Sequence, residues 1–196
     1  MSEERSAAEI MYGRDEAQAS PPEKPRIELW IWPMGHRGHA FLKLVKEDGT
    51  TEELHGRPKG SSVDGSKLEK RRLFPTPQDP SKYTDQGRRV GIVAEGSADD
   101  MAKIWERGVK AADDIEAKKF DYKAYDPSYE FGGSGGEIQN SNSAAYTMGR
   151  AMNLDLDDAV RKAGVERKLP GWGRDLLNPD YRPYKKPAQR LGCYAP

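Results

Sequence analysis

The chain has 196 residues, 35% of them hydrophobic and 33% charged, which predicts one domain of ordinary size with polar segments attached. Its 32 Lys and Arg balance its 32 Asp and Glu, so no basic excess favours nucleic acid as a partner. No run approaches the roughly 20 apolar residues of a transmembrane segment, and residues 1–19 lack the apolar core of a signal peptide. We therefore expect a protein made in the cytosol, whose export would need a dedicated secretion system.

Cysteine usage limits the chemistry further. Cys193 is the single cysteine, so it has no internal disulfide partner and cannot build a cysteine-based zinc site. We expect stability to come from packing, and we expect neither a metal nor another cofactor.

The N-terminal part of the chain divides into a tail and the start of a sheet. Residues 1–25 are polar and rich in proline towards their end, which is typical of an extended tail outside the fold. Residues 26–196 form the single predicted domain, with a C-terminal extension rich in Pro and Tyr. The first strand is expected at residues 27–32, ended by Pro33, with a loop as far as Gly38.

A hairpin and a long connection follow. Residues 39–45 predict a second strand, residues 47–50 a turn, and residues 51–56 the returning strand. Residues 57–89 are dense in Pro, Gly, Ser and Lys, which indicates a connection with at most short pieces of structure. Residues 90–94 then read as another buried strand.

Three helices are expected in the second half of the chain. Apolar residues at three-to-four spacing predict a helix over residues 98–119. A second helix should begin within Asn140–Ser143 and run to about Asn153, and a third should cover residues 157–163 and end at Gly164. The remaining tail is expected to wrap the surface. Together these elements predict an α+β fold, a small antiparallel sheet packed against helices.

The histidines gather in one part of the sequence. His36, His39 and His55 all lie within or beside the predicted hairpin. With only three histidines in the chain, this clustering is uncommon enough to be tested as a functional site. The competing interpretation is that these are ordinary surface or strand-end histidines hydrogen bonded to water.

The hairpin register decides whether His39 and His55 can act together. If Glu47 faces Thr51 across a three-residue loop, Lys43 pairs with His55, and both histidines lie on one face of the sheet. A two-residue Asp48-Gly49 turn would place them on opposite faces. The register is therefore a test of the hypothesis.

Hydroxyl groups mark the start of the second helix. Ser141 and Ser143 lie where backbone N–H groups lack intrahelical partners and the helix dipole is positive, which favours a nucleophile and an oxyanion. The competing interpretation is N-capping, the ordinary role of Ser and Asn at these positions.

These segments together resemble a known superfamily. Gly38-His39-Ala40-Phe41-Leu42, the returning strand ending Glu53-Leu54-His55-Gly56-Arg57-Pro58, and Asn140-Ser141-Asn142-Ser143 are similar to motifs of circularly permuted papain-like proteins. These include lecithin-retinol acyltransferase-like proteins and permuted relatives of NlpC-type cell-wall peptidases. The resemblance covers about residues 26–175. Pro170-Gly171-Trp172 resembles a recurring tail segment of bacterial members, several of which are secreted effectors or toxin domains.

The resemblance implies a catalytic site and a class of substrate. Ser141 matches the nucleophile, His39 the general base and His55 the third polar residue that orients the imidazole. Backbone N–H groups at the helix start, within Asn140, Asn142 and Ser143, would line the site and bind the oxyanion. The implied substrate is an amide or ester in a peptide, a peptidoglycan stem or an acyl lipid. An effector would also have a delivery or immunity protein as its partner.

One residue departs from the family pattern, because Ser141 stands where the family has cysteine. Three explanations remain: an engineered Cys-to-Ser substitution, a natural serine nucleophile, or a catalytically inactive site used for binding. Cys193 is no substitute, because it lies near the C-terminus away from any predicted helix start. The alternatives to an enzyme are an inactive papain-like binding module and an interaction protein that uses its Pro- and Tyr-rich tail.

Overall fold

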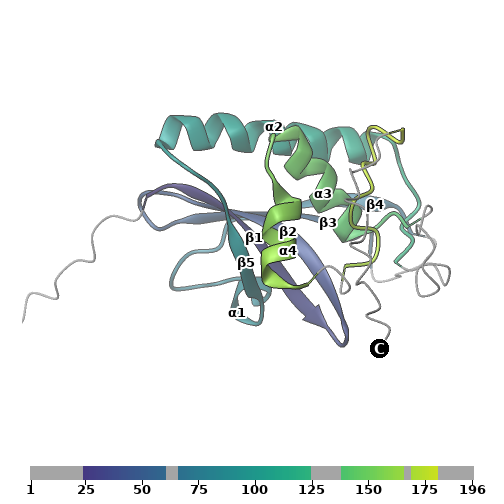
Figure 1. The fold of residues 1–196 in the computed structure, drawn as a ribbon, viewed down its shortest axis with the longest axis horizontal. Coiled ribbons are helices and arrows are strands. Elements are labelled where there is room, and N and C mark those ends of the chain that lie inside the picture. The colour runs from purple at the N-terminus through teal and green to yellow at the C-terminus, as the bar shows by residue number, and fades with distance from the viewer. Residues whose placement is uncertain (1–23, 61–65, 125–137, 166–168, 181–196) are drawn as a thin grey trace, which may run out of the picture.

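The computed structural model describes residues 24–60, 66–124, 138–165 and 169–180. The predicted α+β class is confirmed: five antiparallel strands form one sheet in the order β4-β3-β2-β1-β5. Helices α2 and α3 cover one face of the sheet, and the short helix α1 lies on the other (Figure 1). The predicted N-terminal tail up to residue 23 lies outside the described residues, as does Cys193.

Strands β1 (Arg26–Met34) and β2 (Arg37–Val45) form a tighter hairpin than the sequence predicts. The expected strand end at Pro33 is wrong, because Pro33 pairs with Gly38 inside the ladder. Pairing of β1 with β5 ends at Ile31, so Pro33 has a neighbouring strand on one side only, where proline is tolerated. The expected loop shrinks to a turn in which Gly35 has a φ of 62°.

Strand β3 (Thr51–Pro58) pairs with β2 in a register that differs from the predicted one. Lys43 lies opposite Glu53 and not opposite His55, because the loop covers residues 46–50. The difference amounts to two residues, and side chains alternate with a period of two. His39 and His55 therefore still share one face of the sheet.

The connection over residues 57–89 contains more structure than expected. Strand β4 (Leu68–Leu73) pairs with β3 at one edge of the sheet, and helix α1 (Lys82–Asp85) follows it. The sequence of β4 is mostly charged, which suits an edge strand but hides it from a hydrophobicity pattern. Strand β5 (Arg88–Glu95) forms the other edge. The expectation of a buried strand at residues 90–94 is wrong, because none of its residues is buried at this edge and Ile92 is exposed.

The three predicted helices are confirmed as α2 (Ala98–Ala117), α3 (Ser141–Ala151) and α4 (Leu156–Ala163). Gly164 ends α4 in the left-handed conformation that favours glycine, with a φ of 64°. The main core lies between the sheet and helices α2 and α3. It includes Ile27, Leu29, Leu42, Leu54, Trp105 and Met148.

The segment after α4 does not simply wrap the surface as expected. Leu169 and Leu176 are buried in the main core, and Pro170 packs at the start of α3. Residues 178–180 are exposed, and the predicted extension beyond residue 180 lies outside the described residues.

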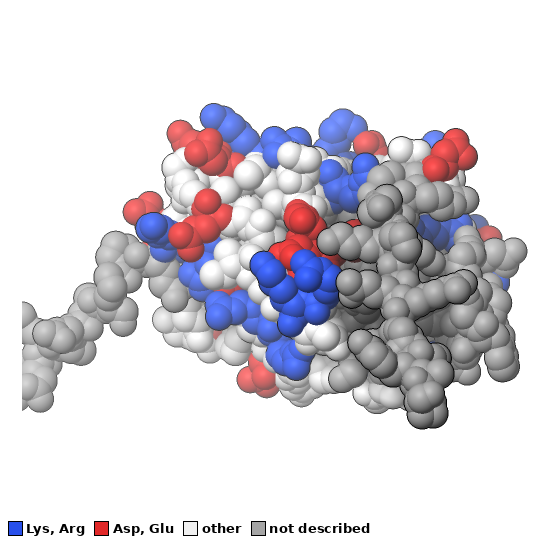
Figure 2. Space-filling model, in the orientation of Figure 1, with Lys and Arg blue, Asp and Glu red and all other residues white. Residues whose placement is uncertain are grey.

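The described surface carries charges of both signs. On the face shown in Figure 2, basic and acidic side chains are interspersed over the described residues. None of the helices within the described ranges is both long and apolar enough to cross a membrane.

Candidate functional site

The start of α3 lies against β2 and β3 at the point where their pairing ends. The two strands pair only from Leu42 and Leu54 to Val45 and Thr51. Beyond that point the backbone N–H of Ala40 donates to Oδ1 of Asn142 at 2.8 Å. The side chain of a helix residue thus satisfies a strand N–H where the β2–β3 ladder has ended.

Gly56 allows α3 to approach β3 closely. A Cβ atom built on Gly56 would lie 2.3 Å from Cβ of Ala144 and 3.6 Å from Cα of Ser141. The first is far below a van der Waals contact, so any larger residue would push the helix away. This glycine therefore sets how near Ser141 lies to the strand that carries His55.

The two asparagines of the Asn140-Ser141-Asn142 motif hold the helix start in place. Oδ1 of Asn140 accepts from the backbone N–H groups of Asn142 and Ser143, and Oγ of Ser143 accepts from the Asn140 N–H, which forms a capping box. The Asn140 side chain also donates to the carbonyls of Ala124 and Pro170, both at 3.0 Å. Nδ2 of Asn142 donates to the same Pro170 carbonyl.

This capping corrects the expected source of the oxyanion-binding groups. The backbone N–H groups of Asn140, Asn142 and Ser143 are engaged within the cap, so they are not available to a substrate. Within the described residues, neither the backbone N–H nor the hydroxyl of Ser141 makes a hydrogen bond. Ser141 is therefore the residue of this motif that can offer both a nucleophile and an oxyanion donor.

A chain of hydrogen bonds links both histidines to a carboxylate. Nε2 of His39 lies 2.9 Å from Nδ1 of His55, and Nε2 of His55 lies 3.1 Å from Oε2 of Glu53. All three side chains are buried. Glu53 and His55 are two residues apart on β3, so the strand period places them on one face. We call these three residues the Glu53–His55–His39 relay.

The charge of Glu53 determines the protonation of the relay. Burial raises the pKa of Glu53, but hydrogen bonds from His55, Ser81 and Thr84 outweigh it and hold the pKa below its usual value. Burial lowers the pKa of His55. Burial and the neighbouring His55 together lower the pKa of His39 well below its usual value. Both imidazoles are therefore neutral at pH 7.

These charges also assign the tautomers. An ionised Glu53 only accepts hydrogen bonds, so Nε2 of His55 carries the proton and its Nδ1 is an acceptor. Nε2 of His39 must then carry the proton that it donates to His55. The lone pair of His39 lies on Nδ1, where it can take a proton from a nucleophile.

Aromatic side chains and helix α1 cover the relay. The ring of Phe41 stacks on His55 at 4.5 Å, and the ring of Tyr83 lies 4.6 Å from His55 and 5.6 Å from His39. Arg57 donates to the Tyr83 hydroxyl and lies over its ring. This packing excludes water from the relay, which strengthens its hydrogen bonds.

The structure places His39 and His55 in hydrogen-bond contact and puts the start of α3 against the strand that carries His39. Ser141 precedes Asn142 and Ala40 follows His39, so one hydrogen bond joins the neighbours of Ser141 and His39. His36 lies exposed in the turn between β1 and β2, outside the relay.

Sequence reasoning missed two members of the site. Glu53 had a signal, because it lies two residues before His55 and must share its face. Tyr83 had none, because it lies in the long connection with no periodic pattern around it.

The described residues contain no group of three or more His, Cys, Asp or Glu side chains arranged to hold a metal ion. Comparisons with protein-family models, with curated proteins and with solved structures find no match. The interpretation of the site therefore depends on its own geometry.

Proposed function

We propose that this chain is a hydrolase of the circularly permuted papain-like type, acting on an amide or ester bond. Ser141 is the nucleophile, His39 the general base, and His55 and Glu53 are positioning residues. The observation that carries this proposal is the buried relay from Glu53 to His39, together with the hydrogen bond that ties Ala40, next to His39, to Asn142, next to Ser141.

The reaction follows the pattern of a serine hydrolase. Oγ of Ser141 attacks the carbonyl carbon while Nδ1 of His39 takes its proton. The Ser141 N–H and the positive end of α3 stabilise the oxygen anion of the tetrahedral intermediate. His39 then gives the proton to the leaving amine or alcohol, and an acyl-enzyme forms. Water, deprotonated by His39, attacks the acyl-enzyme and regenerates Ser141.

The relay supports a serine nucleophile in particular. Serine has a much higher pKa than cysteine, so it depends more on a well-oriented base. An ionised Glu53 at the end of the relay holds both imidazoles in the required tautomers and stabilises the positive charge that develops on His39. Of the three explanations for Ser141, the proposal adopts a natural serine nucleophile.

The proposal extends to substrate and biological setting. The substrate is a peptide, a peptidoglycan stem or an acyl lipid, and the protein is a bacterial effector or toxin exported by a dedicated secretion system. The resemblance of the motifs around Ser141 and Pro170 supports this part. It is tested by expressing the chain in bacteria, directed to the cytosol or the periplasm, and comparing growth with that of the Ser141→Ala variant.

A thiol at position 141 tests the chemistry without knowledge of the substrate. In a Cys193→Ser background, we expect Ser141→Cys to have a thiol pKa below the ordinary value of about 8.5 and to react rapidly with iodoacetamide at pH 6. The matched control is Ser97→Cys, because Ser97 is the N-cap of α2, a helix start whose sequence contains no histidine.

Replacing His39 separates the base from the helix dipole. We expect His39→Ala to return the thiol at position 141 to the reactivity of Ser97→Cys. If the two thiols titrate alike with His39 present, the catalytic proposal is wrong, and an inactive binding module becomes the better interpretation. Release of p-nitrophenol from short acyl esters by the unmodified chain, and its loss in Ser141→Ala, would establish the natural activity.

A further inference from the structure

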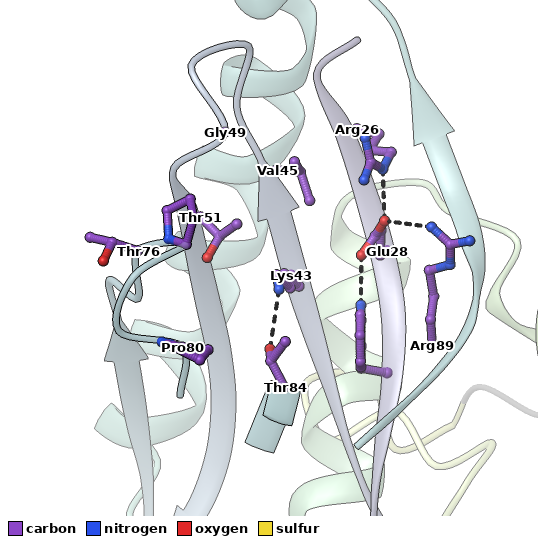
Figure 3. A pocket seen from close by; sticks show the side chains of 12 residues that line it. Arg26, Glu28, Lys43, Val45, Gly49, Thr51, Thr76, Pro80, Thr84 and Arg89 are labelled. Atoms are coloured by element: carbon purple, nitrogen blue, oxygen red, sulfur yellow. Dashed lines mark hydrogen bonds and ion pairs between the residues drawn. The ribbon is translucent and has the colours of Figure 1, made fainter. Parts of the chain in front are cut away.

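A second site lies on the same face of the sheet as the relay. A cavity of about 520 Å³ opens over β1, β2 and β5 and is bounded by the segment that leads into α1 (Figure 3). Lys43, which lines it, is four residues from His39 along β2, which corresponds to about 13 Å. The cavity is thus on the far side of the relay from the α3 start. Its lining includes Arg26, Glu28, Trp30, Lys43, Thr84 and Arg89.

The one acidic side chain in the lining already has its full complement of donors. Glu28 is 2% exposed and accepts from Nε of Arg26 at 2.7 Å, Nε1 of Trp30 at 2.7 Å and Nη1 of Arg89 at 3.2 Å. Burial raises the pKa of Glu28, but these hydrogen bonds outweigh it and keep the carboxyl ionised. Three cations therefore line the cavity against one carboxylate.

Lys43 has only neutral partners at hydrogen-bond distance. Its side chain is 9% exposed, and Nζ donates to Oγ1 of Thr84 at 3.2 Å and lies 5.0 Å from the centre of the Trp30 ring. An ammonium group has three donors, and the described residues give Lys43 this single hydrogen bond. Glu53 is its partner across the ladder, but its oxygens accept from His55, Ser81 and Thr84.

A buried cation of this kind is stabilised by an anion. Burial without an ionic hydrogen-bond partner is costly, and it lowers the pKa of Lys43, an effect that the nearby carboxylates of Glu53 and Glu28 offset only in part. Figure 3 shows Lys43 between Glu28 on one side and Thr51 and Pro80 on the other, with Arg89 at the opposite edge. An oxyanion beside Lys43 can accept from its ammonium group, and Arg89, on the other side of Glu28, adds positive charge to the cavity.

We propose that this cavity binds an oxyanion, a carboxylate or a phosphate, carried on a flat apolar group. Lys43 donates to the oxyanion, Arg89 contributes positive charge at the edge of the cavity, and the apolar group packs on Trp30 beside Val45 and Pro80. The proposal goes beyond the hydrolase function and does not depend on it. The scissile bond of a substrate lies at Ser141, and this site lies behind the relay.

Binding to the full chain tests the proposal with defined probes. Benzoate and phenyl phosphate are titrated by calorimetry, with acetate and inorganic phosphate as probes that lack the flat group. We expect saturable binding at millimolar concentration or below, tighter for the aromatic members of each pair. The difference between benzoate and phenyl phosphate identifies the preferred oxyanion.

Two substitutions assign the binding to this cavity. Lys43→Met keeps the length of the side chain and should weaken binding by about tenfold or more, the effect of a lost charge-assisted hydrogen bond. Lys110→Met is the matched control, because Lys110 is an exposed lysine on α2 that pairs with Asp114. If Lys43→Met fails to fold, Arg89→Gln on the edge strand β5 provides the same test with a partly exposed side chain.

The outcomes separate this proposal from the catalytic one. Equal affinities in Lys43→Met, Arg89→Gln and Lys110→Met, or no saturable binding of any probe, would overturn the oxyanion site. Neither result changes the expected thiol reactivity of Ser141→Cys. Loss of that reactivity, in turn, leaves the oxyanion titrations unaffected.

Discussion

Glu52 and Glu53 are neighbours on β3, yet they serve the two opposite faces of the sheet. Glu52 points towards α2, where Nε1 of Trp105 donates to it at 2.9 Å and Arg72 and Lys46 pair with it. Glu53 points towards α1, where its donors are His55, Ser81 and Thr84. Both carboxyls have a lowered pKa, because their donors outweigh the effect of burial.

The difference between the two carboxylates lies in the donors. Those of Glu52 include two permanent cations near the surface, which anchor the sheet edge to α2. Those of Glu53 are neutral and include a histidine whose second ring nitrogen binds another histidine. The face covered by α2 and α3 is stabilised mainly by apolar packing. The α1 face buries titratable groups in places where apolar side chains would cost less, which is typical of a functional site.

The strongest test removes each carboxylate in turn. We expect Glu53→Ala to reduce the free energy of unfolding by about 3–5 kcal/mol, because the buried His55 and the partly buried Ser81 and Thr84 lose their acceptor. Glu52→Ala should cost less, about 1–2 kcal/mol, because only Nε1 of Trp105 is left buried without its acceptor, while water reaches the partly exposed Arg72 and Lys46. Urea unfolding measures both.

Glu52 and Glu53 should differ more in their effect on the reactivity of residue 141 than in their effect on stability. The conservative Glu53→Gln variant should lower the reactivity of a Ser141→Cys thiol and change its pH profile, while Glu52→Gln leaves both unchanged. Equal effects of the two substitutions on the thiol would show that the relay does not act on Ser141.

Gly56 lies on β3, against the start of α3. We expect Gly56→Ala to destabilise the protein by about 1–3 kcal/mol, because the added Cβ overlaps Ala144. Gly60→Ala is a control for the change in backbone freedom, although its φ of 79° adds strain without any side-chain contact. The Ser141→Cys thiol should lose reactivity only in Gly56→Ala. Retained reactivity there would place the helix start farther from β3 than the structure does.

We expect Asn142→Ala to reduce the free energy of unfolding by about 1–2 kcal/mol. The substitution leaves the buried N–H of Ala40 without its side-chain partner and removes one of the two amide donors to the Pro170 carbonyl. Asn178→Ala, at an exposed position, should change stability by less than about 0.5 kcal/mol. Hydrogen exchange of the Ala40 amide provides the local measurement, and unchanged protection in Asn142→Ala would contradict the assigned hydrogen bond.

Much of the fold followed from local patterns in the sequence. β-Branched and aromatic residues predicted β1, the hairpin pattern predicted β2, and Asn140 and Gly164 marked helix ends through their capping preferences. Strand β4 was not predicted, because its charged residues at the sheet edge show no apolar alternation. The register of β2 and β3 escaped because Asp48-Gly49 is compatible with several loop lengths, and tertiary packing selects among them.

The candidate site was predictable only in part, for a similar reason. His39 and His55 stand out because histidine is rare in this chain, and the strand period gave their shared face in one of the two registers. The roles of Asn140 and Asn142 depend on the Pro170 carbonyl, which reaches α3 from a distant part of the chain. Tyr83 depends likewise on where α1 packs, and no local pattern contains that information.

The smallest expected effect is a loss of folding stability in acid, and it comes from the α1 face of the sheet. His39 has a folded-state pKa well below its ordinary value of 6.5, chiefly because of burial. The unfolded chain therefore takes up a proton below pH 6.5 while the folded chain does not, so stability falls as the pH drops. We expect a loss of about 1 kcal/mol from His39 between pH 6.5 and 5.5.

The charged and titratable groups around the relay determine how this acid sensitivity is read. Glu53 raises the pKa of His55, whereas Arg57 and Arg71 lower it, and the ring of Tyr83 packs against both histidines. Replacing His39 by Gln removes one proton-binding group and should reduce the slope of stability against pH in this window. The slope is measured by urea unfolding at half-unit steps. If His39→Gln leaves it unchanged, His39 is not buried in the neutral form that general-base catalysis at Ser141 requires.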